Sequence, residues 1–301
     1  MSAVVQPVAA GVHLLEVTGA SKRFGGVQAL QGVDLRVAEG QVYGLIGPNG
    51  AGKTTFFNVI TGLVVPDAGR FRLAGHDYKP SAVHQVARAG IARTFQNIRL
   101  FASMTALENV MVGRHVRTRS GVWSAVLRTP GFRHEEAAIR DRAHALLAFV
   151  GLAERAHQQA QTLSYGDQRR LEIARALATE PRLLALDEPA AGMNATEKRQ
   201  LRTLIETIRG QGRTVLIIEH DVKLVMGLCD RVSVLDQGRL IAEGTPAEVQ
   251  RHPAVITAYL GSAHEPFETH EQPQELQQGE DPYRGNWEVR PDAPHGAGDT
   301  A

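Results

Sequence analysis

The sequence has a single cysteine, Cys229, among its 301 residues. One cysteine cannot form a disulfide within the chain, and this one follows an apolar stretch that contains Val225, Met226 and Leu228. We therefore expect a buried, reduced thiol, which suits a protein of the cytoplasm.

Long apolar runs and an excess charge of one sign are also missing. No run approaches the roughly 20 residues that a helix needs to span a bilayer, and the N-terminus lacks a basic segment before its short apolar stretch. The 33 basic and 32 acidic residues leave a formal net charge of +1, which creates no global positive field to attract nucleic acid. The sequence therefore predicts no nucleic-acid partner, and membrane association only through other proteins.

Short apolar segments alternate with helical segments along much of the chain, whose hydrophobic content of 43% allows a substantial core. Strands are expected at residues 42–47, 182–186, 214–218 and 231–235, and helices at 53–63 and 197–209. This alternation favours a mainly parallel sheet that is covered on both faces. Strand-like segments at 14–17, 32–37 and 70–74, interrupted by glycine-rich turns, predict a small antiparallel sheet near the N-terminus.

Two parts of the chain depart from this alternation. Strand signals disappear between residues 105 and 163, and residues 135–150 carry apolar side chains at helical spacing, which predicts a helical subdomain over about 97–165. Residues 262–301 are rich in Glu, Gln, Pro, Gly and Asp, a composition typical of disorder. We predict a flexible N-terminus over 1–12, one folded domain over 13–261, and a disordered tail.

The strand expected at 42–47 leads directly into a G-x-x-x-x-G-K-[ST] pattern at residues 47–54. The glycines let backbone amides turn toward phosphate oxygens, and the following helix adds the positive end of its dipole. Lys53 is expected to reach the outer phosphates, and the Thr54 hydroxyl to bind Mg²⁺. The residues predicted to bind nucleotide here are Asn49, Gly50, Gly52, Lys53, Thr54 and Thr55.

A second element, residues 183–188, is an apolar strand that ends in two carboxylates. An acidic pair after a strand is usually only a solvated loop, but a complete phosphate loop elsewhere in the chain favours a functional pair. We predict that Asp187 binds Mg²⁺ and that Glu188 acts as general base toward water. The two elements together predict hydrolysis of Mg-ATP.

The segment LSYGDQ at residues 163–168 precedes an expected helix and lies just before the acidic strand. In these motifs the chain resembles the ABC ATPase family, which implies an α/β phosphate-loop NTPase (RecA-like) core with a small antiparallel β subdomain and an inserted helical subdomain. Ser164 is also a good N-cap. The resemblance implies that Ser164 and Gly166 cap ATP held by a second ATPase subunit, in a homodimer or heterodimer. Tyr165 and Asp167 depart from the common L-S-G-G-Q form of this signature.

Four further positions match the family residue by residue. Gln96 resembles the Q-loop glutamine, which implies contacts to Mg²⁺ and water, and His220 resembles the switch histidine, which implies a contact to the γ-phosphate. Phe24 matches the aromatic that stacks on adenine, with a core residue as the alternative. Asn194 occupies a position in the D-loop where many relatives have Asp.

Longer stretches resemble the branched-chain amino-acid importer ATPases of the LivG type, and the resemblance covers about residues 14–261. These stretches are residues 93–101, 163–177, 187–194, 219–230 and 258–261. The resemblance implies a peripheral ATPase on the cytoplasmic face of the inner membrane, with a second ATPase, two transmembrane permeases and, indirectly, a periplasmic solute-binding protein as partners. The implied solute is a branched-chain amino acid or a related amino acid or amide.

The sequence leaves several alternatives open. A soluble ABC ATPase of DNA repair or translation would share the nucleotide chemistry, as would the motor of an exporter such as one for lipopolysaccharide. We expect Leu100, Phe101 and Met104 to line a groove for a permease helix near Gln96, with internal packing as the alternative. The basic segment at 114–133 could meet permease or lipid headgroups, although a solvated face is favoured.

Overall fold

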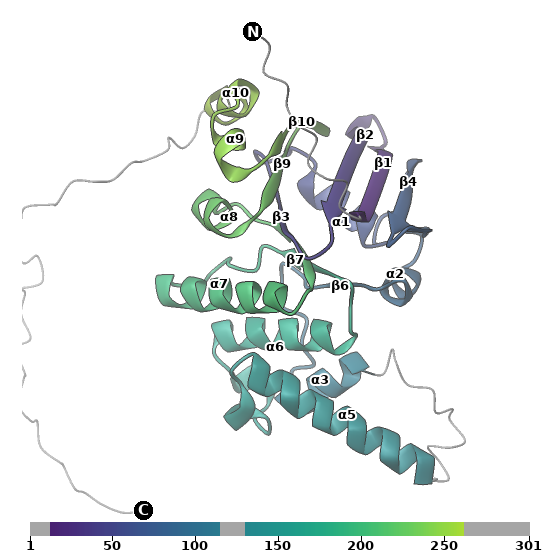
Figure 1. Cartoon of the computed structure of the whole chain (residues 1–301), viewed down its shortest axis with the longest axis vertical. Helices are drawn as coiled ribbons and strands as arrows, with labels where there is room; N and C mark the ends of the chain where they lie inside the picture. Colours follow the sequence, from purple (N-terminus) through teal and green to yellow (C-terminus); the bar gives the residue numbers. More distant parts are fainter. Residues whose placement is uncertain (1–12, 115–129, 262–301) are drawn as a thin grey trace, which may run out of the picture. The chain divides into compact units, whose positions relative to one another are not determined.

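The structure, a computed structural model, describes residues 13–114 and 130–261 (Figure 1). The predicted flexible N-terminus, the predicted tail and the centre of the basic segment at 114–133 lie outside these ranges. Among the helices within them, none has the length and apolar character needed to cross a membrane.

The larger sheet explains how distant segments of the chain reach one site. Its strands, in spatial order, are β10 (Arg239–Gly244), β9 (Arg231–Asp236), β3 (Val42–Ile46), β8 (Thr214–Ile218), β7 (Leu183–Asp187) and β6 (Ile91–Arg93). All neighbours pair in parallel except β10, which runs antiparallel to β9. The carboxyl ends of parallel strands meet at one edge of a sheet, so the loops after β3, β6, β7 and β8 gather there.

Both faces of this sheet are buried, as the continuous apolar strands predict. In β8, Leu216 and Ile218 belong to the core on one face, while Val215 and Ile217 belong to the core on the other. A helix, α8 (Val222–Leu228), packs so closely on β3 that a Cβ on Gly44 would lie 2.8 Å from Val225.

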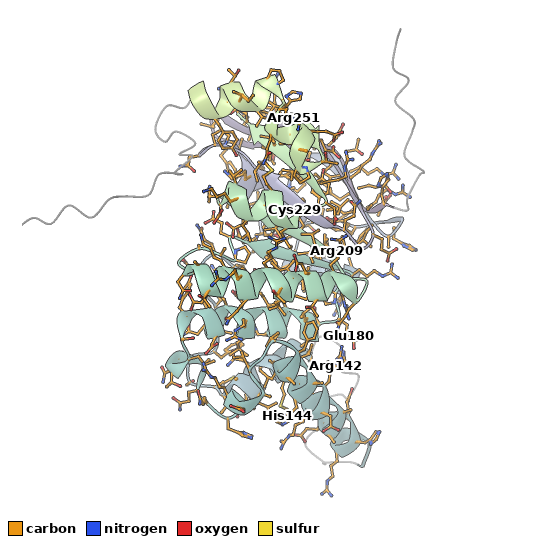
Figure 2. All side chains as sticks on the ribbon, turned by 60° about the vertical axis from the view of Figure 1, so that its left-hand side comes forward. Arg142, His144, Glu180, Arg209, Cys229 and Arg251 are labelled. Atoms are coloured by element: carbon orange, nitrogen blue, oxygen red, sulfur yellow. The ribbon has the colours of Figure 1, made fainter. Side chains whose placement is uncertain are left out.

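The single cysteine closes this helix. Cys229 is the C-cap residue of α8 (Figure 2). The residue is 7% exposed, so the expected burial of its thiol is confirmed. Burial raises the pKa of the Cys229 thiol to about 12. A thiol with so high a pKa is a weak nucleophile at neutral pH, and we assign it a packing role.

The predicted antiparallel sheet is also confirmed. Its strands, in spatial order, are β2 (Val27–Ala38), β1 (His13–Phe24), β4 (Ala68–Leu73) and β5 (His76–Asp77). Its apolar face shares one core with the parallel sheet and with α1 (Lys53–Ile60), whose Phe56, Phe57 and Ile60 are fully buried. The helix that follows the phosphate loop is therefore held between two sheets.

Between β6 and β7 the described residues form helices and no strand, in agreement with the predicted helical subdomain. The helices are α3 (Ala106–Arg114), α5 (Pro130–Phe149), η2 (Ala153–Arg155), η3 (Ala160–Thr162) and α6 (Tyr165–Ala178). Ala143, Leu146 and Leu147 of α5 are buried in one core with Val110 of α3 and Leu171 of α6. The remaining helices are α2 (Val83–Ala89), α7 (Ala195–Gly210), α9 (Pro246–Gln250) and α10 (Pro253–Gly261).

Candidate functional site

The loop between β3 and α1 forms a backbone cradle that glycine makes possible. Gly50 and Gly52 have φ values of 80° and 99°, in the left-handed region that side chains rarely adopt. A Cβ on Gly47 would collide with the carbonyl oxygen of Leu235, so the first glycine is required by close packing against β9. Since α1 begins at Lys53, this loop lies at the positive end of a helix dipole, which suits an anionic ligand.

The Lys53 side chain is 5% exposed and is folded back onto this loop. Its Nζ donates to the carbonyl oxygens of Gly47 at 2.7 Å and Pro48 at 2.9 Å. Burial lowers the pKa of the Lys53 amine, and the charge of Glu188 opposes that shift. The hydrogen-bond partners of the ammonium are thus neutral carbonyls, which phosphate oxygens could replace with a gain in charge complementarity.

The side chains of Gln96 and His220 both contact the carboxylate of Glu188. These three predicted residues follow three different strands, β6, β8 and β7. Gln96 Nε2 donates to Glu188 Oε2 at 2.7 Å, and His220 Nε2 lies 2.7 Å from Glu188 Oε1. Glu188 itself has a φ of 46°, an uncommon value for a residue with a side chain. Its amide donates to the carbonyl oxygen of Ile218 at 2.9 Å, which ties the end of β7 to the end of β8.

The phosphate loop and this cluster face one cavity of about 680 Å³. Val27, Gln28 and Gln31 of β2 line another side of it, next to Gln237 and Gly238 of the turn between β9 and β10. The predicted site residues that line it are Asn49, Gly50, Gly52, Lys53, Thr54, Thr55, Gln96, Glu188 and His220. The arrangement can hold a polyphosphate beside a carboxylate and an imidazole.

Asp187 is not among the residues that line this cavity. It is 3% exposed, and its Oδ2 lies 2.6 Å from Nη2 of Arg93. Burial raises the pKa of Asp187, and the Arg93 guanidinium counteracts that shift. Arg93 also donates to the side chains of Asn58 and Thr61 of the α1 segment. The sequence alone predicts no role for Arg93, because its pairing partner lies 94 positions away.

Phe24 lies at the end of β1 and is 48% exposed. It pairs across the hairpin with Val27, which lines the cavity, but Phe24 itself is not one of the lining residues. Its exposure does not fit the alternative of a core residue. Stacking of Phe24 on a base therefore stays a prediction.

The signature residues occupy a different place. Ser164 and Gly166 line a separate cavity of about 200 Å³, formed with residues of α7. The Ser164 hydroxyl accepts from the amide of Asp167 at 3.3 Å, so its predicted capping role is confirmed. A Cβ on Gly166 would lie 2.6 Å from Oε1 of Glu197, so this glycine permits close packing of α6 on the start of α7. Within one chain, Ser164 does not line the cavity that the phosphate loop lines.

Each departure from the common family pattern has structural contacts. A Cβ on Gly192 would lie 3.2 Å from the Tyr165 ring, and the Tyr165 hydroxyl accepts from Arg169 at 3.0 Å. Asp167, which is 2% exposed, forms ion pairs with two arginines. Asn194 caps α7 in a reciprocal capping box with Glu197. Tyr165 therefore packs against Gly192, two residues before Asn194, while the ion pairs of Asp167 stay within the helical subdomain.

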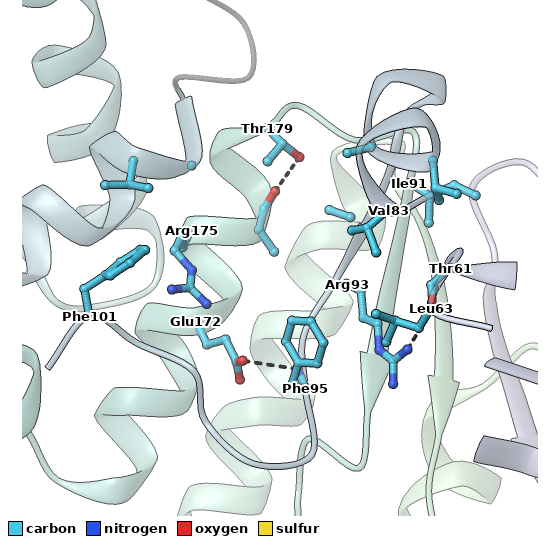
Figure 3. Close-up of a pocket in the computed structure, with 16 residues that line it drawn as sticks. Thr61, Leu63, Val83, Ile91, Arg93, Phe95, Phe101, Glu172, Arg175 and Thr179 are labelled. Atoms are coloured by element: carbon cyan, nitrogen blue, oxygen red, sulfur yellow. Dashed lines mark hydrogen bonds between the residues drawn. The ribbon is translucent and has the colours of Figure 1, made fainter. Parts of the chain in front are cut away.

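A further cavity opens beside Phe95, the residue before Gln96 (Figure 3). Its volume is about 310 Å³. Its apolar lining includes Val83, Ile91 and Phe101, and its charged lining includes Arg93, Glu172 and Arg175. Of the three residues predicted to line a groove for a permease helix, Phe101 lines this cavity and the other two do not. Binding of a permease helix here stays a prediction. Leu100 packs on the hydrophobic core, and Met104 is 36% exposed but outside the lining, because neighbours in an irregular segment point in different directions.

Comparison with known proteins finds relatives along most of the chain. The family model described as ABC transporter matches residues 30–191, and one described as Branched-chain amino acid ATP-binding cassette transporter matches residues 239–265. Over 251 residues, which are 83% of this chain and 98% of the relative, the chain is 48% identical to the high-affinity branched-chain amino acid transport ATP-binding protein LivG of Salmonella typhimurium. It is 49% identical, over the same length and shares, to the corresponding protein BraF of Pseudomonas aeruginosa.

A solved structure agrees with these relatives. An ATP-binding cassette of an ABC transporter in its ADP conformation superposes with a TM-score of 0.72 at 32% identity, covering 83% of this chain and 99% of that chain. The resemblance inferred from the signature and the phosphate loop is therefore confirmed, as is the fold class. The chain belongs to the ABC transporter family, in which it is an ATP-binding cassette that hydrolyses ATP.

Proposed function

We propose that this chain powers an importer of branched-chain amino acids from the cytoplasmic face of the inner membrane. The observation that carries the proposal is the match of residues 239–265 to the branched-chain amino acid cassette model, joined to 48% identity with LivG. This segment includes β10, α9 and α10 and lies outside the part of the chain that carries the nucleotide motifs. It therefore favours the importer over an exporter motor or a soluble ATPase.

The residues around the 680 Å³ cavity of the phosphate loop have distinct proposed roles. Lys53 and the backbone of the phosphate loop bind the phosphates of ATP, Glu188 takes a proton from the attacking water, and His220 stabilises charge at the γ-phosphate. The Thr54 hydroxyl and the Gln96 amide oxygen belong to residues that line the cavity, and oxygen donors of this kind suit Mg²⁺. The Asp187 carboxylate lies outside the lining and pairs with Arg93, so its proposed role is to hold Mg²⁺ through water. When bound, Mg²⁺ supplies positive charge that neutralises the phosphate oxygens.

Hydrolysis is proposed to require two ATPase subunits. The signature residues Ser164 and Gly166 face a cavity separate from that of Lys53, so one chain offers two half-sites. Ser164 and Tyr165 at the start of α6 are exposed, and the positive end of the helix dipole there suits phosphate held by a partner subunit. Closure of the dimer and binding of ATP are thereby coupled.

The cavity beside Phe101 is proposed to receive a cytoplasmic helix of a transmembrane permease. Its apolar lining from α2, β6 and the start of the helical subdomain suits the apolar face of such a helix, and Arg175 adds a charge for orientation (Figure 3). The same segment carries Gln96, whose side chain contacts Glu188. A movement of the permease helix can therefore reach the carboxylate through a short path of contacts.

Reconstitution tests the transported solute. The chain, a second ATPase subunit and two permeases should form a complex that hydrolyses ATP faster when leucine-loaded binding protein is added to proteoliposomes. Accumulation of labelled leucine against its gradient is the direct measurement, with a binding protein loaded with an unrelated sugar as the control. Stimulation by ribosomes or DNA, with no effect of the permeases, would contradict the proposal.

Cross-linking tests the groove. Phe101→Cys should form a disulfide or short-linker cross-link with cysteines placed along a cytoplasmic permease helix, because Phe101 lines the cavity and is 46% exposed. Met104→Cys is the matched control, since Met104 is exposed nearby but does not line the cavity. Equal cross-linking of both positions would argue against insertion of the helix into this cavity.

A further inference from the structure

Glu219 is a buried acid that lies directly beside the proposed site without lining its cavity. Its side chain is 4% exposed, although a carboxylate is among the groups least suited to burial. It follows the last residue of β8 and precedes His220. Among the described residues its hydrogen bonds go to backbone amides and not to a cationic side chain.

These hydrogen bonds join two loops. Oε1 of Glu219 accepts from the amide of Ala190 at 2.7 Å, and Oε2 accepts from the amide of His220 at 3.2 Å. The backbone amide of Asp221 also donates to the Glu219 carboxylate. Burial raises the pKa of Glu219. Ala190 belongs to the loop after β7, and His220 to the loop after β8. One side chain thus connects the segments that present Glu188 and His220.

The loop that Glu219 holds begins with the strained backbone of Glu188. A φ of 46° persists in a residue with a side chain only where the surroundings enforce it. The enforcing contacts are the Glu188 amide on Ile218, the Ala190 amide on Glu219, and the Glu188 carboxylate on His220. Of these three contacts, only the one to the Ala190 amide uses a side chain that has no proposed part in the chemistry, the side chain of Glu219.

A second contact braces the far end of the same loop. Lys198 of α7 forms an ion pair with Asp221 at 2.7 Å, and the Asp221 side chain also caps α8 through the amide of Leu224. The start of α7 follows the D-loop and packs on Gly166 of the signature. The loop from Glu188 to α7 is therefore fixed to the His220 segment at both of its ends.

We infer that Glu219 is a positioning residue for ATP hydrolysis, which holds the Glu188 loop and the His220 loop in register through the amide of Ala190. The inference rests on the proposed roles of Glu188 and His220 and adds a residue that acts through them. Glu219 touches neither the cavity nor the phosphate loop, so it affects turnover and not nucleotide binding.

Glu219→Gln in the full-length chain tests this role, because glutamine keeps the shape while weakening acceptance from three amides. The kcat for ATP should fall by roughly 10- to 100-fold, since small displacements of catalytic groups have effects of this size. The KM for ATP and the affinity for ADP should change less than about threefold. Hydrogen exchange of the Ala190 amide should become faster, which reports the lost contact directly.

Glu248→Gln is the matched control. Glu248 likewise accepts a backbone amide, that of Thr245, but it is exposed at the start of α9, away from the cavity. Its kcat should remain at the wild-type value. An unchanged kcat in Glu219→Gln despite faster exchange at Ala190 would overturn the inference, as would a parallel loss of ADP affinity.

The Glu188→Gln background separates failure of this inference from failure of the proposed base. If Glu219 acts through Glu188, adding Glu219→Gln there should lower the single-turnover rate by less than about twofold, because the effects are not additive. A full additional loss in that background would show that Glu219 acts independently, and would overturn the inference. An active Glu188→Gln variant would instead contradict the proposed base. The kcat of the Glu219→Gln single variant would then decide on the role of Glu219.

Discussion

Glu188→Gln is expected to lower ATP turnover by about 10²- to 10⁴-fold, the range that a general base contributes. Glutamine fills the same space and can keep hydrogen bonds to Gln96 and His220, which lie 2.7 Å from the carboxylate oxygens. It cannot accept a proton from water at neutral pH. The measurement is phosphate release at saturating Mg-ATP, with ATP affinity determined separately by equilibrium binding.

The same substitution should preserve ATP binding and trap the dimer in its closed form. The phosphate loop and Lys53 are unchanged by it, and reopening depends on hydrolysis. Size-exclusion chromatography with ATP should therefore show a stable dimer for Glu188→Gln and a monomer for the wild type after turnover. Glu206→Gln, which removes an exposed carboxylate paired with Arg202 on α7, is the control and should retain turnover. Wild-type turnover in Glu188→Gln would remove this residue from its role.

Local patterns were sufficient to predict most of the fold. The apolar run at 214–218 coincides with β8, and the helical stripe at 197–209 lies within α7. The phosphate loop could be predicted from sequence because its chemistry is contiguous: glycine, lysine and threonine act within eight positions along the chain. The same holds for Ser164, whose capping role depends on an amide three residues away.

Pairings between distant residues could not be predicted in this way. Arg93 and Asp187 are 94 positions apart, and Glu219 and Ala190 are 29 positions apart, so no spacing rule connects them. Both pairs arise because the ends of parallel strands meet at one sheet edge. The choice among Leu100, Phe101 and Met104 as cavity-lining residues could not be made from sequence for a related reason. Residues 100–104 precede α3 in an irregular segment, where sequence gives no periodicity from which to infer side-chain direction.

Lys53→Ala is expected to weaken ATP binding itself, in contrast to Glu188→Gln. A charge-assisted hydrogen bond contributes about 1.5–3 kcal/mol, which corresponds to roughly a 10- to 150-fold rise in Kd. Lys53 Nζ already lies inside the phosphate loop, on the carbonyls of Gly47 and Pro48, so it needs little reorganisation to reach a bound phosphate. Equilibrium binding of Mg-ATP is the measurement.

The control must separate the loss of this contact from the loss of one positive charge. Lys223→Ala removes an exposed lysine on α8 and changes the net charge by the same amount. Because salt at physiological strength screens long-range charge, the Kd of this variant for Mg-ATP should stay within about twofold of the wild-type value. A loss of turnover in Lys53→Ala with unchanged Kd would assign the lysine to the transition state alone. Because Lys53 is buried while its partners are uncharged carbonyls, we expect the effect to appear already in the bound ground state.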